Sequence, residues 1–126
     1  MNPQLAKSGG ALEKATVYIT WLIPVLESFP RSQRFLLGDR LQTLAMDTVA
    51  LIVEATYQKL PQSTLLRVNL LLEQQRVFIR LAYNLKHIDV RRYEFAARKI
   101  DELGQSIGAW IKACKSPASP QAGYQR

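Results

Sequence analysis

The sequence has few of the residues that catalytic and metal sites need. Its 126 residues include one cysteine, Cys114, and one histidine, His87. A single cysteine cannot form an intramolecular disulfide, which fits the reducing cytosol, so we expect a cytoplasmic protein. One cysteine and one histidine also cannot supply the four ligands of an ordinary zinc site within one chain.

Other features of enzymes and membrane proteins are also missing. No glycine-rich phosphate loop opens a helix, and the glutamates lack the Glu-x-x-His motif of metal-binding bundles. No apolar run reaches the roughly 20 residues that span a membrane. The run 15–26 ends without the cleavage site of a signal peptide. We therefore predict a protein without a catalytic centre, cofactor, metal site or membrane contact.

Positive charge is what the chain has in excess. It holds 17 Lys and Arg against 10 Asp and Glu, a net charge of +7. Residues 1–63 contain six basic and five acidic residues, and residues 64–126 contain eleven and five. A basic half favours an acidic partner, either nucleic acid or an acidic protein face. A basic surface that serves only solubility is the alternative.

Hydrophobic periodicity predicts an all-α fold. Apolar residues recur every three or four positions over the ranges 11–28, 33–59, 63–87 and 90–115. Ser32 and Asp89 are the expected N-caps of the second and fourth helices, and Phe35, Leu37 and Leu41 are expected to begin the apolar stripe of the second.

The connections between these helices are short, which favours an antiparallel up-down-up-down four-helix bundle over residues 11–115. The 48% of hydrophobic residues are enough for the core of one domain. Residues 1–10 and 116–126 contain proline and glycine, so we expect a flexible lead-in and a disordered tail.

The third predicted helix is apolar on more than one side. A surface helix of a monomeric bundle needs only one apolar face, so the second face indicates burial at a subunit interface. A central helix in a compact monomer is the alternative. In the fourth helix, Gly104 and Gly108 lie one turn apart and are expected to admit a close neighbour.

Basic residues of the last two predicted helices are the candidate binding residues. Arg76 and Arg80 lie one turn apart in an apolar stretch, where an arginine usually has a protein or phosphate partner. Guanidinium groups offer forked donors that match phosphate oxygens. A solvated face, partly matched by nearby acids, is the alternative. The predicted nucleic-acid or partner site comprises Arg76, Arg80, Lys86, Arg91, Arg92, Arg98 and Lys99.

Three segments resemble a known family. They are F-P-R-S-Q-R-F-L-L-G-D-R at 29–40 with V-E-A at 53–55, the stretch 72–85 with its two arginines, and D-E-L-G-x-x-x-G-x-W at 101–110. Together they are similar to the bacterial four-helix-bundle family of the accessory variability determinant, Avd, of diversity-generating retroelements. Related proteins are encoded within intervening sequences of large-subunit ribosomal RNA genes.

The resemblance implies a function that the residues alone do not show. Members of this family form homopentameric rings, bind reverse transcriptase and RNA, with DNA as a further partner, and support mutagenic cDNA synthesis without catalysis of their own. Arg76 and Arg80 match paired arginines associated with those contacts. Two alternatives stay open: an oligomeric bundle of the ribosomal intervening-sequence type without a retroelement role, and a metal or redox bundle enzyme, which the missing ligand motifs disfavour.

Overall fold

The computed structural model describes residues 8–114, and they are folded into four long helices with no strand among them. The long helices are α1 (Ala11–Glu27), α3 (Asp39–Thr56), α4 (Gln62–Asn84) and α5 (Val90–Cys114). A short helix, α2 (Arg31–Gln33), and a π-helical turn, η2 (Arg34–Gly38), lead into α3. The all-α prediction is confirmed. The expected flexible lead-in and tail lie outside the described residues, except for residues 8–10.

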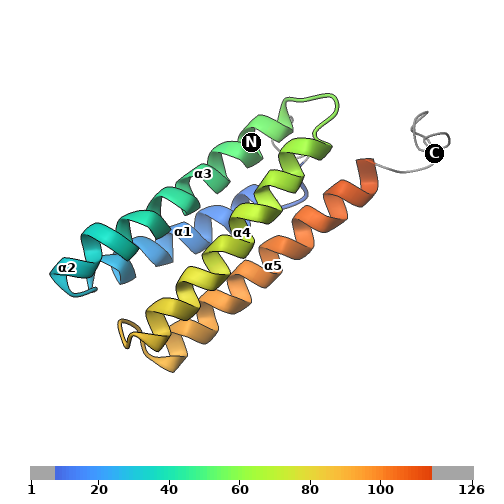
Figure 1. The fold of residues 1–126 in the computed structure, drawn as a ribbon. Coiled ribbons are helices and arrows are strands. Elements are labelled where there is room, and N and C mark those ends of the chain that lie inside the picture. Colours follow the sequence, from blue (N-terminus) through green and yellow to red (C-terminus); the bar gives the residue numbers. More distant parts are fainter. Residues whose placement is uncertain (1–7, 115–126) are drawn as a thin grey trace.

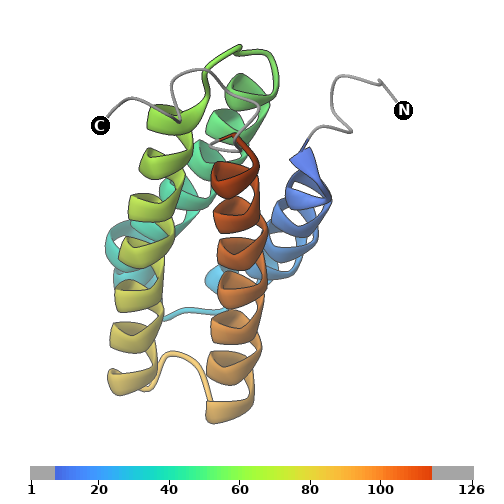
Figure 2. The same cartoon turned by 90° about the vertical axis from the view of Figure 1, so that its right-hand side faces the viewer.

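Helices that follow one another in the chain pack side by side. The contacts are between α1 and α3, α3 and α4, α4 and α5, and α5 and α1, which close the bundle. The α3–α4 connection lies at one end, and α2 and the α4–α5 connection both lie at the other (Figures 1 and 2). The rings of Phe29, just before α2, and His87, in the α4–α5 connection, have centroids 5.3 Å apart. Segments far apart in the sequence therefore share one end of the molecule.

The core is built from the predicted apolar stripes. Leu41, Leu44, Thr48, Leu51 and Ala55, which carry the three-and-four spacing of the second predicted helix, are all buried. In α1 the stripe is centred on Tyr18, which is 2% exposed, while Leu12 and Ile19 are half-buried beside it.

One fully buried polar side chain, Gln75, links α4 to α3. Its Nε2 donates to the Thr48 hydroxyl at 2.9 Å and to the Leu71 carbonyl at 3.2 Å, while its Oε1 accepts no hydrogen bond from the described residues.

The second predicted helix begins differently from the expectation. Ser32 is not an N-cap, because the helix already begins at Arg31 after Pro30, whose carbonyl accepts the amides of Gln33 and Arg34. The amide of Asp39 then bonds the carbonyl of Arg34, five residues back, which adds one residue to the turn. We expected Phe35 to begin the apolar stripe together with Leu37 and Leu41, and for Phe35 this is wrong. The π-helical turn leaves it 68% exposed while Leu37 is buried.

The end of α4 and the start of α5 are both defined by capping. The amide of His87 bonds the Ala82 carbonyl and that of Lys86 bonds the Tyr83 carbonyl, each at 2.9 Å, which is a Schellman motif. This motif ends α4 at Asn84, three residues before the expected end. Asp89 Oδ1 accepts the amide of Arg92 at 2.9 Å, so the predicted N-cap at Asp89 is confirmed.

The second apolar face of α4 is uncovered in the single chain. Leu66, Leu70, Val77 and Leu81 share one side of the helix and are 41–57% exposed. The central-helix alternative is therefore wrong for the isolated chain.

Nothing lies within 4 Å of a methyl group built on Gly104 or Gly108, so the expected close neighbour is not found within the described residues.

Candidate nucleic-acid interface

Arg76 is held by acidic partners within the bundle. Its guanidinium bonds Asp101 of α5 and lies 3.3 Å from a carboxylate oxygen of Glu73. Burial alone would lower the pKa of Arg76, but the hydrogen bonds and charges of Asp101 and Glu73 outweigh that effect and raise it. Arg76 thus joins α4 to α5 and has little unmatched charge for a ligand.

Arg80 lies one turn further along α4 and is exposed. It forms no ion pair with any residue between 8 and 114. The two arginines predicted to act as a pair therefore differ, because α5 supplies a carboxylate to one of them only. His87 lies beyond the end of α4 at Asn84, so it does not extend the helical row of these arginines.

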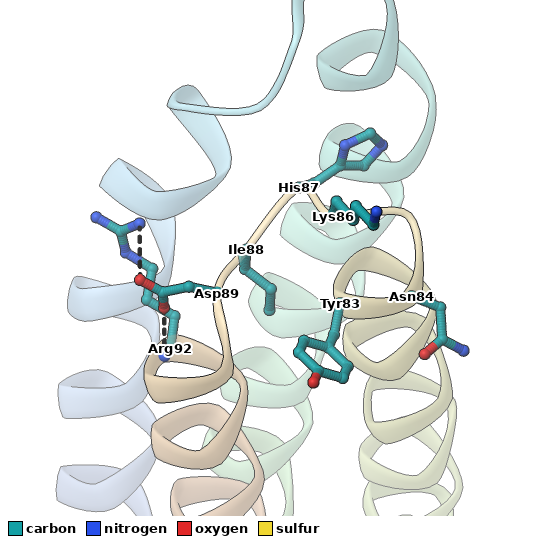
Figure 3. A pocket seen from close by; sticks show the side chains of 7 residues that line it. All are labelled: Tyr83, Asn84, Lys86, His87, Ile88, Asp89 and Arg92. Atoms are coloured by element: carbon teal, nitrogen blue, oxygen red, sulfur yellow. Dashed lines mark hydrogen bonds and ion pairs between the residues drawn. The ribbon is translucent and has the colours of Figure 1, made fainter.

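The α4–α5 connection surrounds an open hollow of about 640 Å³. Tyr83, Asn84 and Lys86 border it from the end of α4, and Asp89 and Arg92 from the start of α5 (Figure 3). The Arg92 guanidinium lies 4.0 Å from Asp89 and is partly neutralised by it. Lys86 is exposed and has no acidic partner in the described chain, which leaves a free cation at the rim.

The backbone of Lys86 is in the left-handed conformation, with φ of 66°. It occupies the position after the α4 C-cap where glycine is the usual residue, because a side chain is disfavoured there. An observed outlier of this kind is a reason to look for a function of the side chain. The free charge of Lys86 at the rim of the hollow is a candidate for that function.

Arg98 and Lys99 lie on the side of α5 that faces α1. Both cations approach the ring of Phe95, at 5.8 and 5.3 Å from its centroid, and Phe95 packs on Trp21 of α1 with centroids 4.6 Å apart. Lys99 also lies 3.5 Å from Glu102. These contacts separate Arg98 and Lys99 from Arg76, which lies on α4 and pairs with the side of α5 that carries Asp101.

The predicted site left out the basic residues just before α3 and in its first turn. Arg31, Arg34 and Arg40 are exposed and form no ion pair in the described part of the chain. The segment that holds them, from α2 to the start of α3, lies at the same end of the bundle as the α4–α5 connection and the start of α5 (Figures 1 and 2). The signal was present in the motif at 29–40, but dividing the charge into two halves of the sequence hid it.

The end formed by residues 28–40 and 84–92, which we call the basic end, carries the net charge of the described chain. It contains six basic and two acidic residues, whereas the remaining residues between 8 and 114 contain eight of each. Five of the six basic residues lack an acidic partner among the described residues, and Arg92 is the exception. A surface of this kind attracts polyanions.

Metal binding, membrane spanning and thiol chemistry find little support in residues 8–114. No three His, Cys, Asp or Glu side chains are grouped there as a metal site would need, and no helix is long and apolar enough to cross a membrane. Burial raises the pKa of the Cys114 thiol, which disfavours the nucleophilic thiolate.

The chain matches a known protein family. A family model described as bAvd-like matches residues 11–114, which is nearly the whole described chain, so the protein belongs to the bAvd-like family. The resemblance seen in the sequence motifs is thereby confirmed. This is a family of accessory proteins rather than of catalysts. No curated protein matches the chain closely enough to count as a relative.

Proposed function

We propose that this member of the bAvd-like family is the non-catalytic accessory protein of a diversity-generating retroelement. In this role it binds reverse transcriptase together with RNA or DNA and supports mutagenic cDNA synthesis. The observation that carries the proposal, beside the family match, is the concentration of the net positive charge at one end of the bundle. Phosphate contacts by basic side chains provide affinity without sequence choice.

The proposal places the nucleic acid on the basic end rather than along the middle of α4 and α5. Lys86, Arg91 and Arg92 from the predicted site belong to this end, and Arg31, Arg34 and Arg40 join them. Arg76 is the weakest candidate, since Asp101 and Glu73 already match its charge. Arg80 is exposed and unpaired in residues 8–114, and it remains available for the reverse transcriptase.

We further propose that the chain is an antiparallel up-down-up-down bundle that assembles into a homopentameric ring. Two exposed apolar faces support assembly: one on α4, described above, and one on α3 formed by Met46 and Val53. A ring joins two different patches of each subunit, and apolar faces on two helices provide them. The open surface at Gly104 and Gly108 would let a neighbouring subunit approach α5 closely.

A reconstituted reaction tests the proposal. Purified reverse transcriptase and its RNA template should yield cDNA only when this protein is added, and the two proteins should elute together. Sedimentation should give a mass about five times that of the 14.3 kDa chain. Efficient cDNA synthesis without the protein would contradict the accessory role, and a monomer at micromolar concentration would contradict the ring.

The alternative function is an oligomeric bundle of the ribosomal intervening-sequence type, without a retroelement role. The exposed apolar faces of α3 and α4 favour assembly equally in this case, because they do not depend on nucleic acid. Lack of reverse-transcriptase binding by a well-folded ring would support this alternative.

A further inference from the structure

We propose that Phe35 and Leu36 form a stacking platform on the basic end for the unpaired bases of single-stranded RNA or DNA. The inference rests on the proposed function, since nucleic-acid binding at the basic end is its premise. It adds the choice of single strands over duplex and names the side chains responsible.

The π-helical turn η2 presents these two side chains to solvent. Phe35 is 68% and Leu36 is 65% exposed, although both belong to a helical segment whose next residue, Leu37, is buried. Helical turns of this type are uncommon and occur frequently at functional sites. The extra residue of η2 rotates Phe35 and Leu36 away from the core, and nothing within residues 8–114 covers them.

Basic side chains accompany each apolar one. Arg31 precedes Phe35 by four residues and Arg40 follows Leu36 by four, so a basic residue lies about one helical turn from each apolar one. Arg34 is adjacent to Phe35 in the chain. None of the three arginines forms an ion pair in the described chain, so their donors are free for a ligand.

This combination fits a strand with accessible bases. A phenyl ring stacks on the face of any base, while neighbouring arginines bind the phosphates on either side. In a duplex both faces of each base are occupied by its neighbours, and an A-form major groove is too narrow for side chains to read. Single strands therefore offer unpaired bases to the platform, whereas a duplex would be bound by the basic residues alone.

The test compares single-stranded and hairpin RNA of the same composition by fluorescence anisotropy. Strands of about 12 nucleotides match the site sizes of single-strand binders. We expect Phe35→Ala to weaken single-strand binding about 5- to 150-fold, as alanine does at other base-stacking aromatics, and to leave hairpin binding within about twofold. Leu60→Ala is the matched control, because Leu60 is also 68% exposed but lies in the α3–α4 connection at the other end.

Two further variants separate stacking from folding. Phe35→Leu keeps an apolar side chain but removes the ring, so it should stay folded and still bind single strands weakly. Phe35→Trp should retain affinity, and its added fluorescence should be quenched by single strands beyond any change seen with the native Trp21 and Trp110.

The outcomes distinguish this inference from the proposed function. Equal single-strand affinity of Phe35→Ala and the unmodified protein, with weaker binding by Arg31→Gln/Arg34→Gln, would overturn stacking while nucleic-acid binding stands. Loss of reverse-transcriptase binding in Phe35→Ala, with unchanged RNA affinity, would make the surface a protein contact and would also overturn it. Absence of RNA binding by the unmodified protein would contradict the proposed function itself.

Discussion

Removing two arginines from the basic end should reduce the salt dependence of RNA binding by a calculable amount. Five basic side chains of this end lack an acidic partner within residues 8–114. If each neutralises one phosphate of a single strand, the slope of log K against log salt is about −0.7 per contact, or roughly −3.5 in total. Raising salt from about 50 to 200 mM should then lower affinity on the order of 100-fold.

The double variant Arg31→Gln/Arg34→Gln removes two of these five contacts. Its slope should fall to about three-fifths of the unmodified value, near −2.1 for one chain. The ratio of the two slopes holds even if several subunits contact one RNA, because it compares the same assembly. Both side chains are exposed and unpaired in the described chain, so the variant should keep the melting temperature.

The assay is anisotropy of labelled single-stranded RNA at four or more salt concentrations. Arg67→Gln/Lys112→Gln is the matched control, because these two exposed residues lie in the other half of α4 and α5 and form no ion pair among residues 8–114. Its slope should stay near that of the unmodified protein. Equal slopes for the Arg31/Arg34 variant and the unmodified protein, with a reduced slope for the control, would refute the assignment of phosphate contacts to the basic end.

Substitutions at four other positions test single contacts. Lys86→Gly should stabilise the fold by about 1 kcal/mol, because glycine accepts the left-handed conformation, and should weaken RNA binding. A loss of stability would show that the backbone at Lys86 is not strained. Gln75→Leu should leave the free energy of urea unfolding unchanged or raise it by up to about 2 kcal/mol, since it removes a buried acceptor that has no partner among the described residues. Gln75→Ala should instead lower it by about 2 kcal/mol or more, because it leaves a cavity. Gly108→Leu should leave the monomer fold intact, because its site is open within the described chain, but should lower the assembled mass in sedimentation; an unchanged assembly would place Gly108 outside the interface. Arg76→Ala should change stability by about 1 kcal/mol or less, as partly exposed ion pairs do, and should alter RNA affinity less than Arg31→Gln/Arg34→Gln; the reverse order would make Arg76 a ligand contact.

The sequence predicted the helices well because the buried stripes follow local periodicity. The stripe from Leu41 to Ala55 and the cap at Asp89 depend on residues a few positions apart, and both are confirmed. The start of the second helix was missed, because the π-helical turn depends on how the chain leaves Pro30 and packs Leu37 and Gly38 against the bundle. A regular helical spacing cannot represent the residue added by such a turn.

The candidate site was predicted less completely, because its residues meet only in three dimensions. Asp101 lies 25 positions after Arg76, and their ion pair follows from the packing of α5 on α4. The basic end joins residues 28–40 to residues 84–92, and a comparison of the two sequence halves divides it. Phe35 was expected in the apolar stripe but is exposed, because the π-helical turn at the start of the second helix was not predicted.

The most direct test of the central claim is to map where RNA touches the protein. Single-stranded RNA is cross-linked to the assembled protein by ultraviolet light, and the modified peptides are identified by mass spectrometry. We predict cross-links in residues 28–40 and 84–92, with few in α4 around Arg76 or in the α3–α4 connection. Cross-links confined to the middle of α4 and α5, with none at the basic end, would contradict the account.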